Sequence, residues 1–369
     1  MGHLQDILFV SLGLVVLDEI RFPNREPLTD VLGGSGAYAT LGARLFLPHP
    51  LSRSLGWIIH VGNDFPEHIE DRLESWDATL TIEREPSKPS TRGLLAYEDT
   101  TFGRAETSPM IYQVLTKKFK YTTPILAIQD HGLESLSLLT SQAYHYLEAP
   151  HSITARLSSL LALRENSGIL ARPLVIWEPA PLSCKPENLQ LCLDAAAIVN
   201  VFSPNHLELA TLFGEPLSTA IDKGRIESLA VNFLDSGVGP DGQGIVIVRA
   251  GEHGCVIMAR NVTPVWLPPF HKSRPGEGQN SKVVDPTGAG NAFLGAFAVG
   301  YLKTGSIVEA ACLGSVGASF ALEQVGMPEK SNNGEKELWN GTDVFSRLNE
   351  YRRSIGRTGD QPKYCAHQS

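Results

Sequence analysis

Apolar and polar positions follow two kinds of pattern along the chain. Short runs rich in valine, isoleucine and aromatic residues are typical of β-strands, and longer stretches with apolar residues three or four positions apart are typical of helices. We expect strands over residues 7–17, 56–62, 93–99, 142–149, 173–179, 196–204, 244–251 and 254–259. We expect helices over residues 36–46, 66–75, 153–165, 206–213, 226–236, 291–304, 307–324 and 343–353.

The order of these elements predicts an α/β fold. Strands that alternate with helices are typical of βαβ units, in which helices cover both faces of a mostly parallel sheet. We therefore expect a three-layer α/β/α domain. Two segments, about residues 18–34 and 91–103, have strand-like patterns with polar edges and no helix. They predict a small sheet that lies over the main one as a lid.

The first apolar run, "ILFVSLGLVVL" over residues 7–17, is similar to the core of a signal peptide. However, Asp6 stands where such peptides carry positive charge, and "DEIR" follows where small residues are expected. The run is also too short to span a bilayer. We interpret it as a buried first strand, and we expect a cytoplasmic protein with no membrane partner.

Composition and charge narrow the functional classes. The 369 residues carry a formal net charge of −9, with 42% hydrophobic and 19% charged residues. This composition is ordinary for a packed globular protein, and without a basic surface signal no nucleic-acid partner is expected. The five cysteines form no CxxC pair. This spacing excludes a zinc ribbon and a thioredoxin-type motif, and it favours reduced thiols.

A glycine turn joins a predicted strand to a predicted helix within "VVDPTGAGNAFLG", residues 283–295. The N–H groups and the dipole at a helix start favour an anion, and Gly288, Ala289 and Gly290 allow it to approach the backbone closely. This pattern predicts a cradle for a phosphate or an oxyanion. The alternative is a tight turn with Asn291 as the helix N-cap. The Gly-Lys-Ser/Thr sequence of a P-loop is absent.

Two further strand ends carry candidate ligand residues. Asn205 and Glu208 lie at helical spacing after a predicted strand, where an amide and a carboxylate can hold a hydrated Mg²⁺. The alternative is a helix N-cap followed by a surface acid. Gly251 lies between two predicted strands, either beside a nucleotide phosphate or in a simple hairpin. Because ligands of α/β folds collect at the carboxyl ends of strands, the three features together favour one site.

At these residues the chain resembles the PfkB carbohydrate kinases, which have the ribokinase-like fold. The resemblance covers about residues 8–327 and looks closest to a fungal branch, the maintenance-of-killer-like proteins. "DPTGAGNAFLGAF" is similar to the C-terminal signature of the family, and "GGSGAYATLGARL" is similar to its N-terminal glycine motif. Three shorter segments match the Val-Gly-x-Asp, Asn-x-x-Glu and Thr-x-Gly-x-x-Gly motifs, namely "HVGNDFPEHI", "SPNHLELATLFG" and "RAGEHG".

The resemblance implies a kinase domain over residues 1–330 and a C-terminal extension over residues 331–369 with one helix. It implies ATP and Mg²⁺ as cofactors, with a monovalent cation as a further candidate. The implied acceptor is an alcohol group of a sugar, a nucleoside or a similar small molecule. A homodimer formed through the lid is a further candidate assembly.

The resemblance also implies roles for individual residues. The implied acceptor site consists of Asp18, Gly33, Gly34, Ser35 and Tyr38. The implied catalytic loop consists of Gly288, Ala289, Gly290 and Asn291, and Asn205 and Glu208 would support the metal. We expect nucleotide-binding roles for Arg249, Gly251, Gly254, Asp285, Thr287, Ala318 and Ser319.

Three residues depart from the family pattern. Asn291 stands where the family has its catalytic Asp, Tyr38 replaces a sugar-binding Asn, and Arg249 replaces a Thr. An amide accepts no proton at neutral pH, so Asn291 predicts a slow kinase, a kinase that uses another base such as Asp285, or a nucleotide-binding protein without turnover. On this reasoning Asn291→Asp should raise turnover. Tyr38 should give the acceptor pocket an aromatic wall for stacking.

Other classes of protein match less well. Residues 34–39 fit the dinucleotide-binding pattern G-x-G-x-x-A, but no tight strand–helix turn precedes them. No HExxH pair and no PCxxC segment occur, so the sequence supports neither a zinc protease nor a zinc deaminase. The main alternative to an enzyme is a catalytically silent nucleotide-binding, structural or regulatory protein on a kinase fold.

Overall fold

The apolar runs of the sequence form the centre of the molecule. The computed structural model describes residues 6–22, 25–97, 118–128, 130–133, 137–216, 221–273, 280–334 and 336–356. Within these residues one nine-stranded sheet has the order β13-β12-β11-β10-β9-β8-β1-β4-β5. The strands are β1 (Phe9–Ser11), β4 (Leu55–Gly62), β5 (Thr79–Glu85), β8 (Ala143–Glu148), β9 (Leu174–Pro179), β10 (Val201–Phe202), β11 (Ile245–Arg249), β12 (Cys255–Ala259) and β13 (Val262–Leu267).

The sheet is mostly parallel, as the alternation of elements predicts. All neighbouring pairs from β11 to β5 are parallel, whereas β12 and β13 form an antiparallel edge. Its central strands are buried on both faces: Ile245 and Ile247 of β11 pack into one core, and Val246 and Val248 pack into the other. Burial on both faces explains why these strands appear in the sequence as continuous apolar runs.

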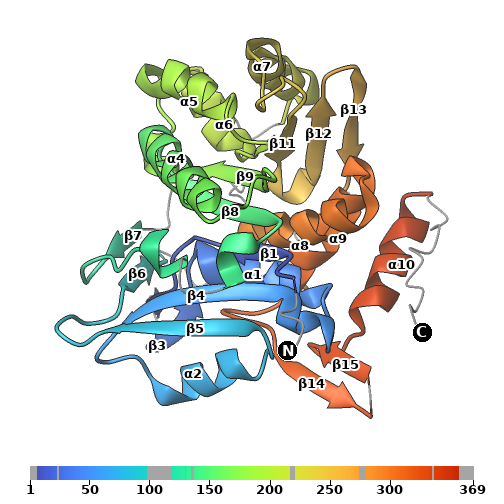
Figure 1. Ribbon diagram of the computed structural model, residues 1–369. Helices are drawn as coiled ribbons and strands as arrows, with labels where there is room; N and C mark the ends of the chain where they lie inside the picture. The colour runs from blue at the N-terminus through green and yellow to red at the C-terminus, as the bar shows by residue number, and fades with distance from the viewer. Residues whose placement is uncertain are drawn as a thin grey trace, which may run out of the picture.

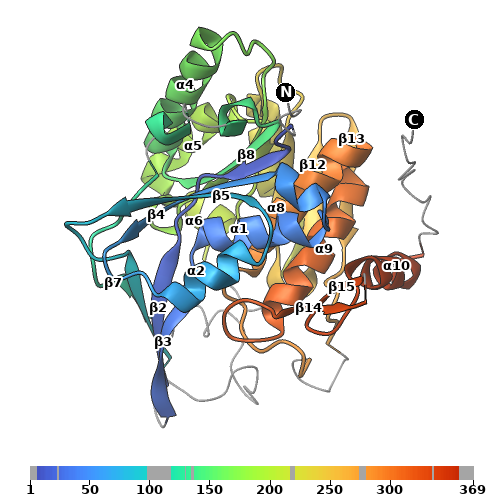
Figure 2. The ribbon, with the colours of Figure 1, turned by 60° about the horizontal axis from the view of Figure 1, so that its bottom comes forward.

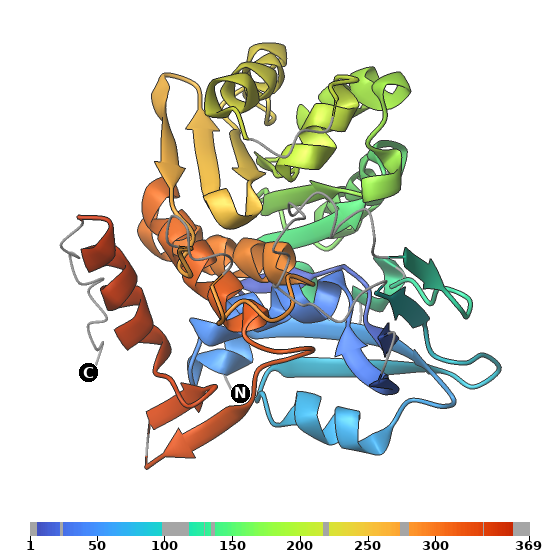
Figure 3. The same ribbon diagram turned by 180° about the vertical axis from the view of Figure 1, so that it is seen from behind.

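Helices cover both faces of the sheet, which confirms the three-layer α/β/α architecture (Figures 1 and 3). One core joins the sheet to α1 (Ser35–Leu45), α2 (Glu67–Glu74), α8 (Ala289–Thr304), α9 (Ile307–Leu322) and α10 (Val344–Ser354). The other core joins it to α4 (Pro150–Asn166), α5 (Leu189–Ala196), α6 (His206–Leu212) and α7 (Lys223–Ser236). Short 3₁₀ turns are η1 (Leu51–Ser54), η2 (Asp130–Leu133), η3 (Ser137–Thr140), η4 (Pro181–Ser183), η5 (Pro186–Asn188) and η6 (Gly251–His253).

A second, four-stranded sheet projects from the main one at its β4–β5 side (Figure 2). Its order is β3-β2-β6-β7, with β2 (Val16–Phe22), β3 (Arg25–Gly33), β6 (Arg92–Ala96) and β7 (Lys118–Tyr121). This sheet contains the expected lid segments, although residues 98–103 of the second segment lie outside the described residues. The run at residues 7–17, expected as one strand, is divided between β1 of the main sheet and β2 of the lid.

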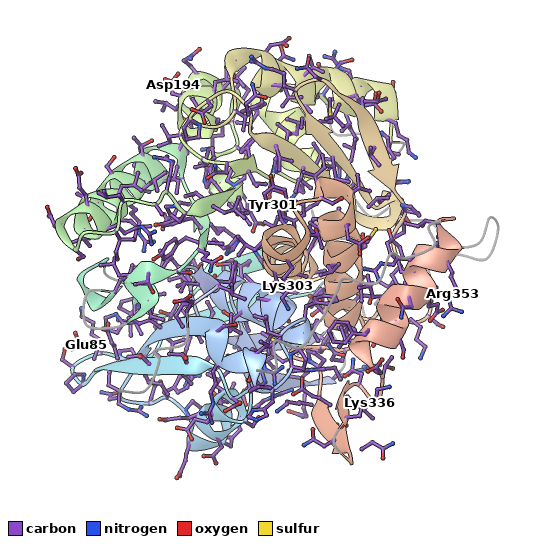
Figure 4. All side chains as sticks on the ribbon, turned by 45° about the vertical axis from the view of Figure 1, so that its right-hand side comes forward. Glu85, Asp194, Tyr301, Lys303, Lys336 and Arg353 are labelled. Atoms are coloured by element: carbon purple, nitrogen blue, oxygen red, sulfur yellow. The ribbon has the colours of Figure 1, made fainter. Side chains whose placement is uncertain are left out.

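The C-terminal region contains more than the one expected helix. A hairpin of β14 (Lys330–Asn333) and β15 (Lys336–Trp339) precedes α10, and residues 357–369 lie outside the described residues. Figure 4 shows side chains filling the space between the layers, with Lys336 and Arg353 marking the hairpin and α10. Among the described residues, no helix has both the length and the apolar character needed to cross a membrane.

Candidate functional site

A cavity of about 480 Å³ opens beside the carboxyl ends of β9 and β11 and the start of α8. This is the edge at which ligands of open α/β sheets bind. The cavity brings together eleven of the residues that the sequence singled out, namely Asn205, Arg249, Gly251, Gly254, Thr287, Gly288, Ala289, Gly290, Asn291, Ala318 and Ser319. Asp285, Glu208 and the five acceptor-side residues do not line it.

The glycine loop forms the first turn of α8. Gly288 is the N-cap residue with a φ of 76°, a left-handed conformation that glycine adopts without strain. Asp285 holds the preceding turn, because its Oδ1 accepts hydrogen bonds from the Thr287 backbone N–H at 2.9 Å and from the Thr287 hydroxyl at 2.6 Å. The expected roles of Asp285 as a base or in nucleotide binding remain predictions. The structure assigns its carboxylate to shaping the loop.

Arg249 brings a positive charge to the same loop. It ends β11, and a Cβ atom added at Gly290 would lie only 2.1 Å from Arg249 Nη1. The guanidinium is therefore packed directly against the first turn of α8. Its side chain is 12% exposed, and Nε has no hydrogen-bond partner among the described residues. A buried cation beside helix N–H groups is an arrangement that binds phosphate oxygens.

Glu178, which the sequence analysis did not single out, connects Arg249 to Asn291. It lies near the end of β9, and its Oε1 is 2.7 Å from Arg249 Nη1. Asn291 Nδ2 donates a hydrogen bond to Glu178 Oε2 at 2.5 Å. His145 Nε2 lies 3.5 Å from the same oxygen, and His145 Nδ1 is 3.0 Å from Ser11 Oγ. The sequence carried a signal for both residues, because each is an ionisable residue within a mainly apolar strand. Glu178 lies in "LVIWEP" and His145 lies in "AYHYLE".

The two buried carboxyl groups near Arg249 differ in their ionisation. Burial by itself raises the pKa of Glu178, but the charges and hydrogen bonds of Arg249 and His145 outweigh burial and hold the pKa below its usual range. Burial is the main reason that the pKa of Glu208 is raised to about 7. The positive charge of Arg249 lowers this pKa, and the negative charge of Glu178 raises it further. At neutral pH Glu178 is therefore ionised, whereas Glu208 titrates near this pH.

Asn205 and Glu208 form a helix cap rather than an open pair of metal ligands. Asn205 Oδ1 accepts hydrogen bonds from the N–H groups of Leu207 and Glu208 at 2.9 and 2.8 Å. Glu208 Oε2 in turn accepts one from Asn205 N–H at 2.7 Å, which completes a capping box. Arg249 Nη2 also lies 3.7 Å from Glu208 Oε2. Asn205 Oδ1 and Glu208 Oε2 are therefore engaged in the cap, and the expected metal role of the pair remains a prediction.

The described residues contain no group of three or more His, Cys, Asp or Glu side chains arranged to hold a metal ion. Mg²⁺, as the ion bound to ATP, remains a prediction.

We expect Glu208→Gln to flatten the pH dependence of stability between about pH 4.5 and 7. The pKa is raised from 4.5 to about 7 in the folded chain, so folding takes up a proton and the free energy of unfolding falls as the pH rises through this window. The loss of unfolding free energy over this window is about 3 kcal/mol. Glutamine keeps an oxygen for the Asn205 N–H group. Urea denaturation at pH 5 and pH 8 measures the effect, and Glu165→Gln, at an exposed residue, is the control. If the pH dependence of Glu208→Gln equals that of wild type, the raised pKa of Glu208 is contradicted.

The far end of the cavity is apolar and is braced by the C-terminal helix. Phe270, Phe293, Leu322 and the helix α9 residues Ala318 and Ser319 line this end. Apolar walls with few polar groups are typical of sites for a nucleotide base.

The C-terminal extension supports this end of the cavity from behind. Arg347 of α10 donates a hydrogen bond to Ser319 Oγ at 3.1 Å, and its guanidinium lies over the Phe270 ring at 5.3 Å from the centroid. Its Nη1 also lies 2.9 Å from Glu323 Oε1. α10 is thus part of the structure that shapes the apolar part of the cavity.

The expected acceptor residues lie where the lid joins α1: Asp18 and Gly33 belong to the lid strands β2 and β3, and the others lie at the start of α1. The Asp18 carboxylate lies between two glycines, because a Cβ added at Gly33 or at Gly93 would fall within 2.3 Å of its oxygens. Gly34 is the N-cap residue of α1, with a φ of 94°, and Ser35 begins that helix. The residues are therefore near one another, but they lie outside the lining of the cavity at the glycine loop.

Tyr38 does not provide the expected stacking wall. It is 2% exposed, and a Cβ added at Gly288 would lie 2.1 Å from its ring, so the ring packs against the glycine loop from behind. Burial, together with the charges of Asp285 and Asp18, raises its pKa well above the usual range. Tyr38 therefore supports the turn at Gly288, and its ring has no open face in this structure.

Comparisons with known proteins agree with this fold. Residues 27–332 match the model of the pfkB family of carbohydrate kinases. An uncharacterized protein of Schizosaccharomyces pombe is 34% identical, with coverage of 94% of this chain and 93% of the relative. The protein MAK32 of Saccharomyces cerevisiae is 28% identical, with coverage of 95% and 93%. The crystal structure of a putative ribokinase II of E. coli in complex with ATP and Mg²⁺ has a TM-score of 0.60 at 16% identity, covering 95% of this chain and all of that one.

Proposed function

The chain belongs to the pfkB family of carbohydrate kinases, and from this premise we propose that it transfers the γ-phosphate of ATP to an alcohol group of a small molecule. The observation that carries the proposal is the contact between Arg249 and the Gly288–Gly290 turn at one end of the cavity. A guanidinium and the N–H groups of a helix start together favour three closely spaced anionic oxygens, which a terminal phosphate supplies.

The size and lining of the cavity support ATP as the donor. About 480 Å³ is within the range of roughly 300–1,000 Å³ typical of ligand sites. The phosphate chain would lie along Gly251 and Arg249, and the base would lie at Phe270, Ala318 and Ser319. A putative ribokinase II of E. coli, which shares the fold, was crystallised with ATP and Mg²⁺, and this supports ATP as the donor.

The acceptor would enter from the lid side and present its hydroxyl to the loop. Asp18, fixed between Gly33 and Gly93, is the candidate residue to accept hydrogen bonds from other hydroxyl groups of the acceptor. Tyr38 would act from behind the loop by holding Gly288 in place, not by stacking on the acceptor. Candidate acceptors are sugars, nucleosides and vitamin-like alcohols.

A catalytically silent nucleotide-binding protein is the second candidate. The ion pair between Arg249 and Glu178 favours it, because a carboxylate beside the anion site competes with phosphate for the guanidinium. Such a protein would bind ATP and act through a partner or as a sensor of nucleotide.

Calorimetry with Mg·ATP and a radiolabelled phosphotransfer assay distinguish the two candidates. We expect micromolar to millimolar nucleotide affinity and transfer to at least one member of a panel of sugars, nucleosides and vitamin-like alcohols. ATP binding without transfer to any acceptor or to water would support the silent protein. Absence of ATP binding would overturn both candidates.

A further inference from the structure

Phosphotransfer to an alcohol is fastest when a carboxylate accepts the hydroxyl proton, and the amide of Asn291 cannot do so. Yet a carboxylate oxygen, Glu178 Oε2, lies 2.5 Å from Asn291 Nδ2. We propose that Glu178 is the proton acceptor of this protein and that Asn291 is a positioning residue that holds its carboxylate at the phosphate loop. This inference rests on the proposed phosphotransfer function.

Glu178 is placed where a reacting hydroxyl would meet the loop. Its side chain lines the same cavity as Gly288, Ala289 and Gly290, although the residue is only 5% exposed. It is paired with Leu147 in the parallel register of β8 and β9, so its backbone is fixed by the main sheet. A reactive group on a central strand is held more precisely than one on a loop.

The surroundings of Glu178 keep it ionised but leave it able to accept a proton. Oε1 contacts Arg249 Nη1 at 2.7 Å, and Oε2 contacts Asn291 Nδ2 and lies 3.5 Å from His145 Nε2. An ionised carboxylate offers about four lone-pair positions. These three contacts therefore leave room for one more donor, the hydroxyl of the acceptor.

Other carboxylates near the loop are less suitable. Asp285 Oδ1 is occupied by the N–H and hydroxyl of Thr287, and Asp285 does not line the cavity. Glu208 Oε2 accepts the N–H of Asn205, and Glu208 lies behind the lining. Glu252 lines the cavity at the η6 turn and not at the glycine loop, and its side chain is exposed.

The contact also explains why residue 291 is an amide. An Asn side chain donates from Nδ2 to the carboxylate, whereas an Asp at this position would place two carboxylates in hydrogen-bond contact. Two such groups cannot both remain ionised. The expectation that Asn291→Asp speeds the reaction is therefore reversed: we now expect it to slow the reaction by protonating or displacing Glu178.

In the proposed step, one bond to the γ-phosphorus forms, one breaks, and one proton moves to Glu178. The acceptor oxygen forms a bond to the γ-phosphorus, and the bond from that phosphorus to the oxygen bridging it to the β-phosphate breaks. The hydroxyl proton passes to a carboxylate oxygen of Glu178. Phosphorylated acceptor and ADP leave, and Glu178 releases its proton to solvent.

Exchanging the carboxylate of residue 178 with the amide of residue 291 tests the proposal in the full-length chain. Glu178→Gln, Asn291→Asp and the double variant are compared with wild type. Glu337→Gln is the control, because it breaks another Glu–Arg contact, the partly buried one with Arg44, outside the cavity. Binding of Mg·ATP is measured by calorimetry. Turnover is measured as release of labelled phosphate with water as acceptor, and as transfer to the acceptor panel.

We expect Glu178→Gln to lower kcat by roughly 10²–10⁴-fold, the usual contribution of a general base, with a change in nucleotide Kd below about tenfold. We expect Asn291→Asp to be slower than wild type. The double variant restores one carboxylate facing one amide, so its kcat should exceed that of Glu178→Gln by about tenfold or more. Glu337→Gln should keep the wild-type rate.

Each contrary result has a separate meaning. Wild-type turnover in Glu178→Gln, or no recovery in the double variant, overturns the role of Glu178 and leaves phosphotransfer standing. Nucleotide binding by wild type with no turnover on any acceptor or on water overturns phosphotransfer itself, and the base with it. If Glu178→Gln does not fold, Glu178→Asp is measured instead. This variant keeps the negative charge on a side chain that is shorter by one methylene group. A wild-type rate in Glu178→Asp overturns the proposal.

Discussion

Replacement of Gly290 by valine is expected to abolish nucleotide binding while the chain stays folded. A Cβ atom at residue 290 would lie 2.1 Å from Arg249 Nη1, which is closer than any stable contact between such atoms. Valine adds two methyl groups beyond that atom and fills the space that a terminal phosphate would need. The guanidinium must move away from the first turn of α8, and the proposed anion site is lost.

Calorimetry with Mg·ATP measures this effect. We expect Kd to rise by about 100-fold or more, which corresponds to at least about 2.8 kcal/mol of binding free energy. Gly224→Val is the matched control, because a Cβ there meets only Asp222 Oδ1 at an ordinary 3.4 Å on another helix, α7. Equal affinity of Gly290→Val and wild type would show that the γ-phosphate does not bind at this loop.

Replacement of Arg249 by methionine is expected to cause the largest loss of stability among single substitutions in the site. Arg249 is the cation in contact with the buried Glu178 carboxylate, and it also donates from Nη2 to the Ser203 carbonyl oxygen at 2.8 Å. Removing one member of a buried ion pair leaves an uncompensated charge and costs about 3–5 kcal/mol. The pKa of Glu178 should rise as a result, because burial then acts without the opposing charge.

Urea denaturation at pH 7.5 tests the second prediction. Arg260→Met serves as the control, because Arg260 is exposed and makes one long hydrogen bond, from Nη2 to Leu234 O at 3.3 Å. Adding Glu178→Gln to Arg249→Met removes the unpaired charge, so the double variant should regain about half of the lost stability. If the two substitutions are simply additive, the ion pair does not account for the loss.

Much of the fold could be predicted from local patterns. The strand at residues 56–62 is buried on both faces and appears as a continuous apolar run, and the helix at 291–304 ends at a glycine with a φ of 66°. The errors have local causes as well. β5 is rich in polar residues and was not expected, while only two residues of the run at 196–204 form a strand, since the run begins at the end of α5.

In the candidate site, too, some features could be predicted from the local sequence and others could not. The glycine loop at Gly288–Gly290 and the turn at Gly251 could be found because each is a short turn with a characteristic glycine pattern. The acceptor wall at Tyr38 was misjudged, because whether a ring has an open face depends on what packs against it, here the turn at Gly288. The metal role of Asn205 and Glu208 was weighed against a helix cap, and the observed hydrogen bonds form the cap.

The sequence by itself therefore determined the α/β architecture, the glycine turn at the start of α8 and the membership of the chain in its family, because these depend on short local patterns of residues. Only the tertiary structure decided which side chains meet at that loop. Asn291 and its hydrogen-bond partner Glu178 are 113 positions apart, and they meet because β9 lies in the main sheet at the start of α8. The order of strands in a sheet is set by the packing of the whole domain, so no local pattern reveals that the carboxylate missing from residue 291 is supplied by another strand.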